Sequence, residues 1–270
     1  MKNPLIVPEL REYLAENKAE ALHSLYENVP PAIAAEFISA LDPPEIVQVL
    51  RYAPALQQAE IFSHLDEDIQ VEAAGIMPIE EIATLIDHMP ADDRVDFLKQ
   101  LPEELNDAIL RLLSISERED IRKLSAYEEQ TAGAIMTSDH VTLPAHLNVA
   151  QAIELLRREA PNKETIYYAY VVDDDRKLLG FVSLKNLILA DPEKRIRDIM
   201  KTNVLFIRAE DDQEEALHIM QKYDLIALPV INSGDRLAGI ITIDDMMDVG
   251  EEEATTDFHR MATVGEVSGG

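Results

Sequence analysis

The sequence predicts an α + α/β fold, in which a right- or left-handed superhelix of short helices is followed by two copies of one α/β unit. Two observations support this prediction. Residues that favour the start of a helix recur every twelve positions from residue 30 to residue 114. After residue 130, one pattern of strands and turns occurs twice in the chain.

The N-terminal part of the chain has a helix-starting residue at every twelfth position. These residues are Pro30, Asp42, Pro54, Asp66, Pro78, Pro90, Pro102 and Ser114. Apolar pairs seven and eight positions after a start predict the buried face, namely Phe37 and Ile38, Val49 and Leu50, Ile61 and Phe62, Leu85 and Ile86, and Phe97 and Leu98. Because helices this short are marginal alone, we expect them to stack into one superhelical domain over residues 1–126.

The C-terminal part repeats itself at an offset of 59 residues, residues 170–186 matching residues 229–245. Each copy reads as a strand, a polar turn, a second strand entered through a glycine, and a helix opened by Ser or Thr. The matched positions are Gly180 and Gly239, Ser183 and Thr242, and Asn186 and Asp245. Two unrelated hairpins would not be expected to agree at so many positions.

An amphipathic helical stretch precedes each copy, with apolar residues at Val149, Ile153 and Leu156 and then at Ala216, Ile219 and Met220. Before these stretches stand Ile135-Met136-Thr137 and Ile199-Met200-Lys201, a further matched pair. This order of elements resembles the CBS domain, and its repetition resembles a tandem CBS (Bateman) pair. We assign residues 127–196 to the first CBS domain and residues 197–257 to the second.

The composition excludes several kinds of site. The chain has no cysteine, which excludes disulfides, thiolate zinc sites and a cysteine nucleophile. No apolar stretch approaches the roughly 18 residues of a membrane-spanning helix, and the N-terminus lacks a signal peptide, so we expect a soluble chain in a reducing, cytosolic setting. We expect residues 258–270 to be the start of a connecting segment or a truncated end, because the last four, 267–270, follow an acidic helix without a packing pattern of their own.

The acidic charge is the strongest functional signal. The chain has 24 basic and 52 acidic residues, a formal net charge of −28, which disfavours nucleic acid and favours cations as partners. The acids gather in residues 210–215, in residues 244–257, and at Asp87, Asp92, Asp93 and Asp96. Carboxylates without Cys or clustered His suit Mg²⁺, Ca²⁺ or Mn²⁺. The alternative is a solvated acidic surface.

A divalent ion between such acidic elements would reverse the sign of their interaction. Two carboxylates about 4 Å apart repel by roughly 1 kcal/mol in water and roughly 4 kcal/mol at an effective dielectric constant of 20. We therefore expect acid-rich domains to separate without the ion and to close with it.

Catalytic motifs are absent from the sequence. The seven histidines are scattered, and no HExxH, GxSxG, Walker or GxGxxG pattern occurs. Asp173-Asp174-Asp175 begins like a calcium loop but lacks the later Gly and Glu, so it favours a hairpin turn. We predict that the chain is not an enzyme.

Several segments resemble the cytosolic region of MgtE-type magnesium transporters, over essentially the whole chain. They are YEEQTAGAIMT (127–137), ETIYYAYVVDD (164–174), NLILADP (186–192), DDQEEAL (211–217) and TIDDMMDVGEEEATTD (242–257). The resemblance implies a Mg²⁺ sensor on the cytoplasmic side of the cell membrane. Bound Mg²⁺ would hold a homodimer compact and shut the membrane-spanning pore domain of the same full-length protein, and low Mg²⁺ would open it.

The resemblance also implies the ligands of the metal sites, position by position. The matching residues are Glu60, Asp92 and Asp96 in the helical domain, Asp212, Glu214, Asp224, Asp245 and Asp248 in the CBS pair, and Glu253 and Asp257 toward the connecting helix. For Glu60 and Asp224, the residues alone favour an exposed helical face or a helix terminus. Thr256 stands where relatives carry an acid, which implies weaker ion binding nearest the pore.

Adenine nucleotides, ATP above all, are the second class of ligand that the resemblance implies. The candidate contacts are Tyr168, Ser183, Lys185, Asn186 and Leu225. Asn186 replaces the expected ribose-binding Asp, and Leu225 stands where an aromatic residue would stack on the base. Without a ligand, Tyr168 would be a half-buried sheet residue and Lys185 a solvated one. The alternative function is therefore a nucleotide-sensing CBS module that controls another partner.

Overall fold

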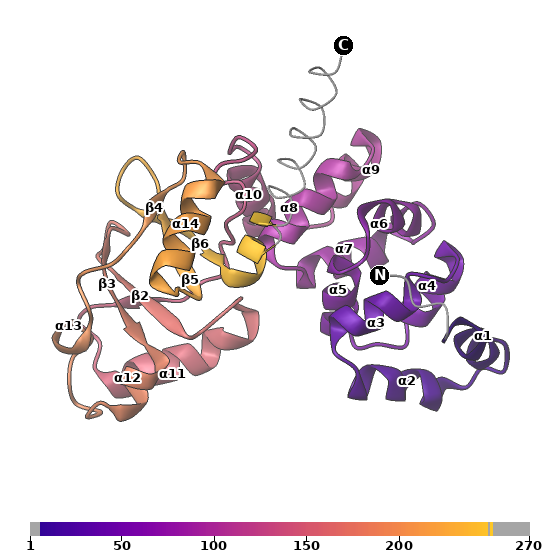
Figure 1. Cartoon of the computed structure of the whole chain (residues 1–270), viewed down its shortest axis with the longest axis horizontal. Coiled ribbons are helices and arrows are strands. Elements are labelled where there is room, and N and C mark those ends of the chain that lie inside the picture. The colour runs from indigo at the N-terminus through magenta and orange to yellow at the C-terminus, as the bar shows by residue number, and fades with distance from the viewer. Residues whose placement is uncertain (1–5, 248, 251–270) are drawn as a thin grey trace, which may run out of the picture. The chain divides into compact units, whose positions relative to one another are not determined.

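The structure is a computed structural model that describes residues 6–247 and 249–250 (Figure 1). The chain divides into two compact units, with the boundary between Arg122 and Lys123. Among the described residues, no helix is both long and apolar enough to cross a membrane. A helical region followed by a pair of small mixed sheets confirms the predicted fold class.

The N-terminal unit is built from short helices. They are α1 (Val7–Ala15), α2 (Ala19–Asn28), α3 (Pro31–Ile38), α4 (Pro43–Leu50), α5 (Ala55–Ser63), α6 (Glu67–Ala74), α7 (Ile79–His88), α8 (Ala91–Gln100), α9 (Glu103–Leu110) and α10 (Ile115–Leu124). All eight predicted starts are confirmed, because each lies immediately before a helix, from Pro30 before α3 to Ser114 before α10. The twelve-residue spacing did not predict α1 and α2.

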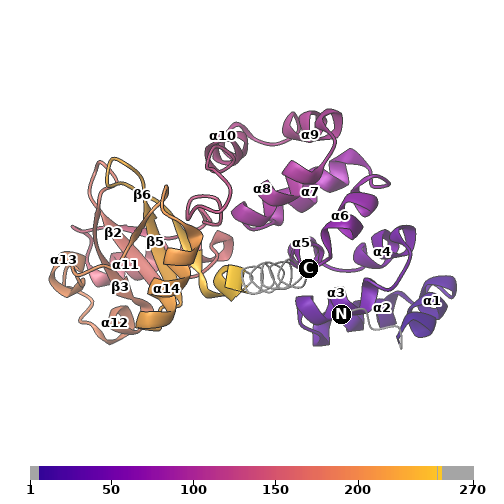
Figure 2. The same cartoon turned by 45° about the horizontal axis from the view of Figure 1, so that its top comes forward.

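The helices of this unit stack on their second neighbours, which produces two rows (Figure 2). One row runs α3, α5, α7, α9, and the other runs α4, α6, α8. Side chains from the predicted apolar pairs fill the space between them; Phe62 of α5 and Phe97 of α8 meet edge to face with ring centroids 5.2 Å apart. The continuous core expected of stacked short helices is therefore present.

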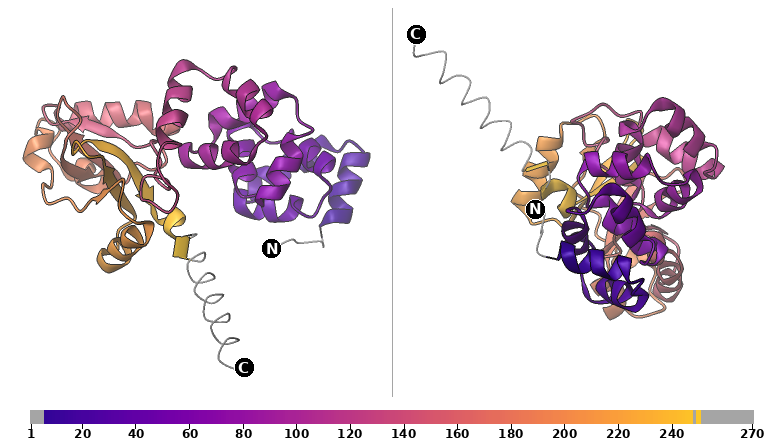
Figure 3. Two further views of the ribbon diagram at one scale, coloured as in Figure 1. Left: turned by 90° about the horizontal axis from the view of Figure 1, so that it is seen from above. Right: turned by 90° about the vertical axis from the view of Figure 1, so that its right-hand side faces the viewer.

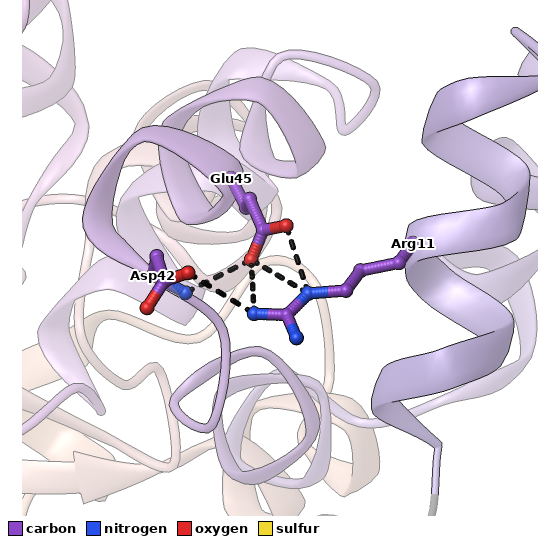
Figure 4. Close-up of polar contacts among 3 residues, drawn as sticks. All are labelled: Arg11, Asp42 and Glu45. Carbon is purple, nitrogen blue, oxygen red and sulfur yellow. Dashed lines mark hydrogen bonds and ion pairs between the residues drawn. The ribbon is translucent and has the colours of Figure 1, made fainter.

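Helix α1 is joined to this array by a forked ion pair (Figure 4). Arg11 donates from Nε to Glu45 Oε1 at 2.8 Å and from Nη2 to Glu45 Oε2 at 2.9 Å, and it also reaches Asp42 Oδ2 at 3.1 Å. The backbone N–H of Asp42 donates to Glu45 Oε2, so the same carboxylate caps α4. Hydrogen bonding to Arg11 lowers the pKa of Glu45 below its usual range.

The second unit contains two three-stranded sheets of identical design. The first has β1 (Thr142–Pro144), β2 (Tyr168–Val172) and β3 (Leu178–Ser183), and the second has β4 (Ile207–Arg208), β5 (Ala227–Ile231) and β6 (Leu237–Thr242). In both sheets the first two strands are parallel and the last two form an antiparallel hairpin. Both hairpins shift register at matched positions, and each turn holds a left-handed residue, Arg176 (φ 64°) and Asp235 (φ 57°). The predicted duplication is confirmed.

Helices cover the outer face of each sheet, and the inner faces pack against one another (Figure 3). The helical elements are α11 (Val149–Glu159), the 3-10 turn η1 (Ala160–Asn162), α12 (Leu184–Leu189), α13 (Ile196–Ile199) and α14 (Gln213–Tyr223), and residues 243–247 are helical after β6. Val149 and Leu156 of α11 are buried against the first sheet, as predicted. On the other face of that sheet, Tyr170 packs with Leu237 and Ile240 of the second copy.

The two copies exchange the segments that lead into them. Thr137, which precedes the first copy, exchanges backbone hydrogen bonds of 2.8 and 3.0 Å with Ile240 of β6. Lys201, which precedes the second copy, exchanges bonds of 3.0 and 2.9 Å with Phe181 of β3. A Cβ atom on Gly239 would lie 2.6 Å from Thr137 O, and one on Gly180 would lie 2.6 Å from Lys201 O. The repeated glycines are needed because the lead-in segment of the other copy crosses directly over each.

Candidate metal and nucleotide sites

The start of α14 presents the first group of predicted metal ligands. Asp212 is the N-cap of this helix, and its Oδ1 accepts a hydrogen bond from the backbone N–H of Glu214 at 2.8 Å. The preceding Asp211 accepts from the N–H of Arg208 at 2.9 Å through Oδ2. Acids at a helix N-terminus interact favourably with its dipole, so several can be held there despite their repulsion. Asp212 and Glu214 are both exposed to solvent.

The other described ligands of the second copy lie at helix ends. Asp224 is the left-handed C-cap of α14, with φ 51°, and is exposed. Asp245 is half-buried in the first turn after β6, where its Oδ2 lies 2.7 Å from Thr242 Oγ1. The same hydroxyl lies 2.5 Å from Asp244 Oδ1. A threonine hydroxyl has one hydrogen, so it can donate to only one of these carboxylates at a time.

In the helical unit, Glu60 is exposed on α5, and Asp92 and Asp96 lie on α8. Asp92 is in the first turn and half-buried, and Asp96 is exposed and pairs with Lys99 Nζ at 3.1 Å. A cation bound by Asp96 would therefore share the carboxylate with Lys99 or compete with it for Oδ1.

Among the described residues, no group of three or more His, Asp or Glu side chains is arranged to hold a metal ion. Asp248, Glu253 and Asp257 lie outside the described residues. The ligand set thus stays a prediction, based on the resemblance and on the acidic character of the helix ends.

A carboxyl pair that the sequence analysis missed connects α7 and α10. The pKa of Asp87 is raised, first by a hydrogen bond with Glu117 and then by burial. The same hydrogen bond lowers the pKa of Glu117. Glu117 Oε2 also accepts from the Ser114 N–H at 2.6 Å, and Ser114 Oγ accepts from the Glu117 N–H at 3.2 Å. The Ser-x-x-Glu spacing of this capping box was the available signal. Asp87 is thereby joined to a helix cap.

Four of the five predicted nucleotide contacts gather at one end of the β2–β3 hairpin. Tyr168 and Ser183 are register partners, and Ser183 Oγ accepts from the Asn186 N–H at 3.2 Å as the N-cap of α12. The Tyr168 ring meets Phe181 edge to face at 5.4 Å, and Lys185 is exposed beside Asn186.

Leu225 comes from the second copy. It is half-buried directly after α14 and donates its N–H to Met220 O at 3.0 Å. It stands two residues before Ala227, whose side chain belongs to the cluster against which Tyr168 packs. Leu225 is thus two residues before β5, whose first residue, Ala227, packs with side chains of the β2–β3 hairpin.

Comparison with known proteins agrees with this architecture. The chain matches the family model "MgtE intracellular N domain" over residues 29–130 and the CBS domain model over residues 132–193 and 196–252. It is 44% identical over 153 residues to the magnesium transporter MgtE of Thermus thermophilus, covering 57% of this chain and 34% of that protein. It is 41% identical over 148 residues to MgtE of Enterococcus faecalis, covering 55% and 33%. The chain therefore spans about a third of the length of these curated relatives.

Two solved structures match nearly the whole chain. The "soluble part of a magnesium transporter" aligns with a TM-score of 0.85 and 33% identity, covering 92% of this chain and 97% of that one. The "cytosolic domain of the Mg2+ channel MgtE in complex with ATP" aligns with a TM-score of 0.83 and 35% identity, covering 89% and 98%. The chain thus belongs to the MgtE family of magnesium transporters and has the domain order of that family's cytosolic region, an MgtE N domain followed by two CBS domains.

Proposed function

We propose that this chain is the Mg²⁺-sensing regulatory region of a magnesium transporter or channel, and that Mg²⁺ bound at acidic sites between its domains shuts a membrane-spanning pore. The observation that carries the proposal is the uneven distribution of charge. Residues 1–122 hold 9 basic and 25 acidic residues, and residues 204–270 hold 4 basic and 15 acidic residues. Residues 123–203, with 11 basic and 12 acidic residues, are nearly neutral.

This distribution leaves two strongly acidic parts separated in sequence by a neutral one. Bringing the acidic parts together costs free energy at low ion concentration, and a divalent cation shared between them removes that cost. The assigned ligands of the two parts are Glu60, Asp92 and Asp96 on one side and Asp212, Glu214, Asp224, Asp245 and Asp248 on the other. Glu253 and Asp257 would act toward the connecting helix.

Linkage sets how many ions such a switch needs. A ligand that binds only the closed form stabilises it by about 2.7 kcal/mol per site at a hundredfold excess over its dissociation constant. Converting a nearly open population into a nearly closed one takes about 5.5 kcal/mol. Two or three cooperating weak sites are therefore the minimum, and a steep response to Mg²⁺ is expected.

A scattering experiment tests this proposal. The radius of gyration should fall when Mg²⁺ is added to chelator-treated protein at constant ionic strength. Replacing Asp92, Asp96 and Asp245 by Asn should raise the Mg²⁺ concentration at the midpoint by roughly tenfold or more, because each carboxylate contributes on the order of 1 kcal/mol. Identical dimensions with and without Mg²⁺ would reject the sensor.

A charge-matched control separates site binding from general screening. Glu36, Glu72 and Asp174 are exposed acids outside the predicted ligand set, and replacing them by Gln, Gln and Asn removes the same three charges. This control should compact at the wild-type Mg²⁺ concentration. An equal shift in both triple variants would reject the assigned ligands and leave a purely electrostatic effect.

We also propose that the regulatory region acts as a homodimer. Three large apolar side chains support this: Ile188 and Leu189 on α12 are 66% and 74% exposed, and Met247, which matches Ile188 at the 59-residue offset, is 67% exposed. Such side chains are candidates for burial against a second copy. Sedimentation of an Ile188→Glu, Met247→Glu double variant should give a monomer where the unaltered chain gives a dimer.

ATP binding in the CBS pair is the second candidate function, supported by the ATP complex of a similar domain. Tyr168, Ser183, Lys185, Asn186 and Leu225 are the proposed contacts, with Lys185 meeting the phosphates. Scattering during separate titrations with Mg²⁺ and with ATP distinguishes the two functions. The Mg²⁺ sensor should compact without nucleotide, whereas a nucleotide-controlled module should change its dimensions only with ATP. In both cases the chain regulates and does not catalyse, and the proposed partner is the pore domain of the same full-length protein at the cytoplasmic side of the membrane.

A further inference from the structure

Residues 127–133, here called the strap, bind the start of α14 through backbone hydrogen bonds. Ala132 N–H donates to Asp211 O at 2.8 Å, and Gly133 N–H donates to Ala209 O at 2.9 Å. In the opposite direction, Gln213 N–H donates to Gln130 O at 3.0 Å. The strap precedes the first CBS copy in sequence but pairs with the second copy.

The strap has a fixed internal conformation. Gln130 has a left-handed backbone, with φ 64°, and Thr131 Oγ1 donates to Glu128 O at 2.7 Å across the turn. The Tyr127 ring lies over Gly133: a Cβ atom on this glycine would lie 2.6 Å from Tyr127 Cγ and 2.9 Å from Ala209 O. Only a glycine therefore allows the ring and the α14 segment to approach Gly133 from both sides.

The Tyr127 side chain also faces the acidic segment that precedes α14. Burial, and then the nearby charge of Glu210, raise the pKa of Tyr127. The ring is half-buried, so it adds apolar contact to that of Ala132, whose side chain is fully buried in the same segment.

From these contacts we infer that the strap is a conformational device that fastens the chain leaving the helical unit to the second CBS copy, so that only Ser125 and Ala126 separate α10 from the fastened part. This inference does not depend on cation binding and goes beyond the proposed function. The strap makes the hinge between the units short, and it places Asp212 in the same hydrogen-bonded segment as that hinge. A ligand that binds the second copy and changes the backbone at the start of α14 would also change the strap that is hydrogen-bonded to it. Through the strap it would act on the chain that connects to the helical unit.

Glu128 and Glu129 are exposed in the folded chain, but the hydrogen-bonded turn holds their backbone. Opening the strap would free residues 125–136 and would let this backbone take the extended conformation that a protease cleaves. The test is digestion of the whole chain by a glutamyl endopeptidase, together with hydrogen exchange at the amides of Ala132, Gly133 and Gln213. In the Gly133→Ala variant, cleavage after Glu128 or Glu129 should be at least tenfold faster, and the three amides should exchange at least tenfold faster. Exchange in β2 and α11 should be unchanged, which shows that the CBS pair is still folded.

Two further variants keep the inference falsifiable if Gly133→Ala does not fold. Tyr127→Ala should also open the strap, and Tyr127→Phe, which keeps the ring, should behave like the unaltered chain. Gly75→Ala is the matched control, because a Cβ atom there would meet only helix carbonyls at 3.4 and 3.6 Å. Equal cleavage and exchange in Tyr127→Ala and Tyr127→Phe, or fast exchange of the three amides in the unaltered chain, would overturn the inference.

Discussion

The two CBS copies have the same backbone design and opposite chemistry at the same helix start. After β3 the first copy places Lys185 and Asn186, and at the matching positions after β6 the second copy places Asp244 and Asp245. A basic and an amide side chain suit a phosphorylated ligand, and two carboxylates suit a cation. In the proposed regulator, the first copy therefore supplies four of the five nucleotide contacts, and the second copy supplies cation ligands and Leu225.

The comparison also shows which features the fold itself requires. The register shift, the left-handed turn residue and the crossed glycine occur in both copies. The first two belong to the hairpin, and the glycine is needed because the exchanged lead-in segment crosses over it. The charged residues at the helix starts are not needed for this crossing, and they differ. Four predictions use this contrast.

The largest expected effect comes from the crossed glycines. A Cβ atom on Gly239 would meet three atoms of Thr137 and Met136 between 2.6 and 2.9 Å, and one on Gly180 would meet Lys201 O at 2.6 Å and Met200 Sδ at 3.2 Å. Gly239→Ala should therefore lower the free energy of unfolding by about 3 kcal/mol and Gly180→Ala by about 2 kcal/mol. Urea unfolding measures both losses of unfolding free energy. A larger loss for Gly180→Ala than for Gly239→Ala would contradict the prediction, and would mean that the second copy relaxes more easily around the added Cβ atom.

Much of this fold could be predicted from local patterns. The twelve-residue spacing located eight helices because a cap and a buried pair are short-range features, and Ser183 and Thr242 indicated the helices after β3 and β6 for the same reason. Strands β1 and β4 were missed, because strands of three and two residues carry no periodicity. The exchange of Thr137 and Lys201 was missed because it is a long-range pairing.

The candidate site could be predicted only in part. The sequence placed Ser183 and Asn186 on one helix start, where the structure also has them. It did not predict that Asp96 pairs with Lys99, or that Asp87 bonds Glu117 from another helix, because side-chain partners depend on packing between elements. The choice of individual metal ligands among the acids comes from the resemblance, since many acids in this chain have similar local surroundings.

A buried histidine gives the second prediction. His140 is 7% exposed in the first copy, and the strand pairings match it to Val204 of the second. Burial, and then the charges of Arg176 and Lys163, lower the pKa of His140 to about 3. The unfolded chain therefore binds a proton near pH 6.5 that the folded chain rejects, so folding stability contributed by His140 is lost as the pH falls from about 6.5 toward about 3.

The measurement compares the unaltered chain with His140→Val, which copies the second domain. Between pH 7 and pH 5.5 the unaltered chain should lose about 1 kcal/mol more unfolding free energy than the variant. Few carboxylates titrate in this interval, and those that do are common to both chains. Parallel pH profiles would show that His140 is protonated equally well in the folded state.

The third prediction converts the nucleotide side of the first copy toward the second. Asn186→Asp supplies a charged acceptor for a ribose hydroxyl, and a hydrogen bond to a charged group is stronger than a neutral one by about 1 kcal/mol. ATP affinity measured by calorimetry should rise about fivefold. Asp245→Asn is the reciprocal control and should leave ATP binding unchanged; a weaker ATP affinity in Asn186→Asp would mean that charge repulsion from the phosphates dominates.

The smallest expected effect concerns an ion pair found in the second copy. Arg208 Nη2 lies 3.0 Å from Asp235 Oδ1, and these positions match Pro144 and Arg176 of the first copy. In the first copy Arg176 instead lies near the carbonyl of Leu237, at 3.4 Å from Nη2. Both partners of the Arg208–Asp235 pair are largely exposed, so Asp235→Asn should change the unfolding free energy by less than about 0.5 kcal/mol, and added salt should remove the difference. A loss above about 1 kcal/mol that persists in salt would mean that the carboxylate of Asp235 stabilises its left-handed turn through the backbone, and the charge difference between the two turns would then contribute to folding.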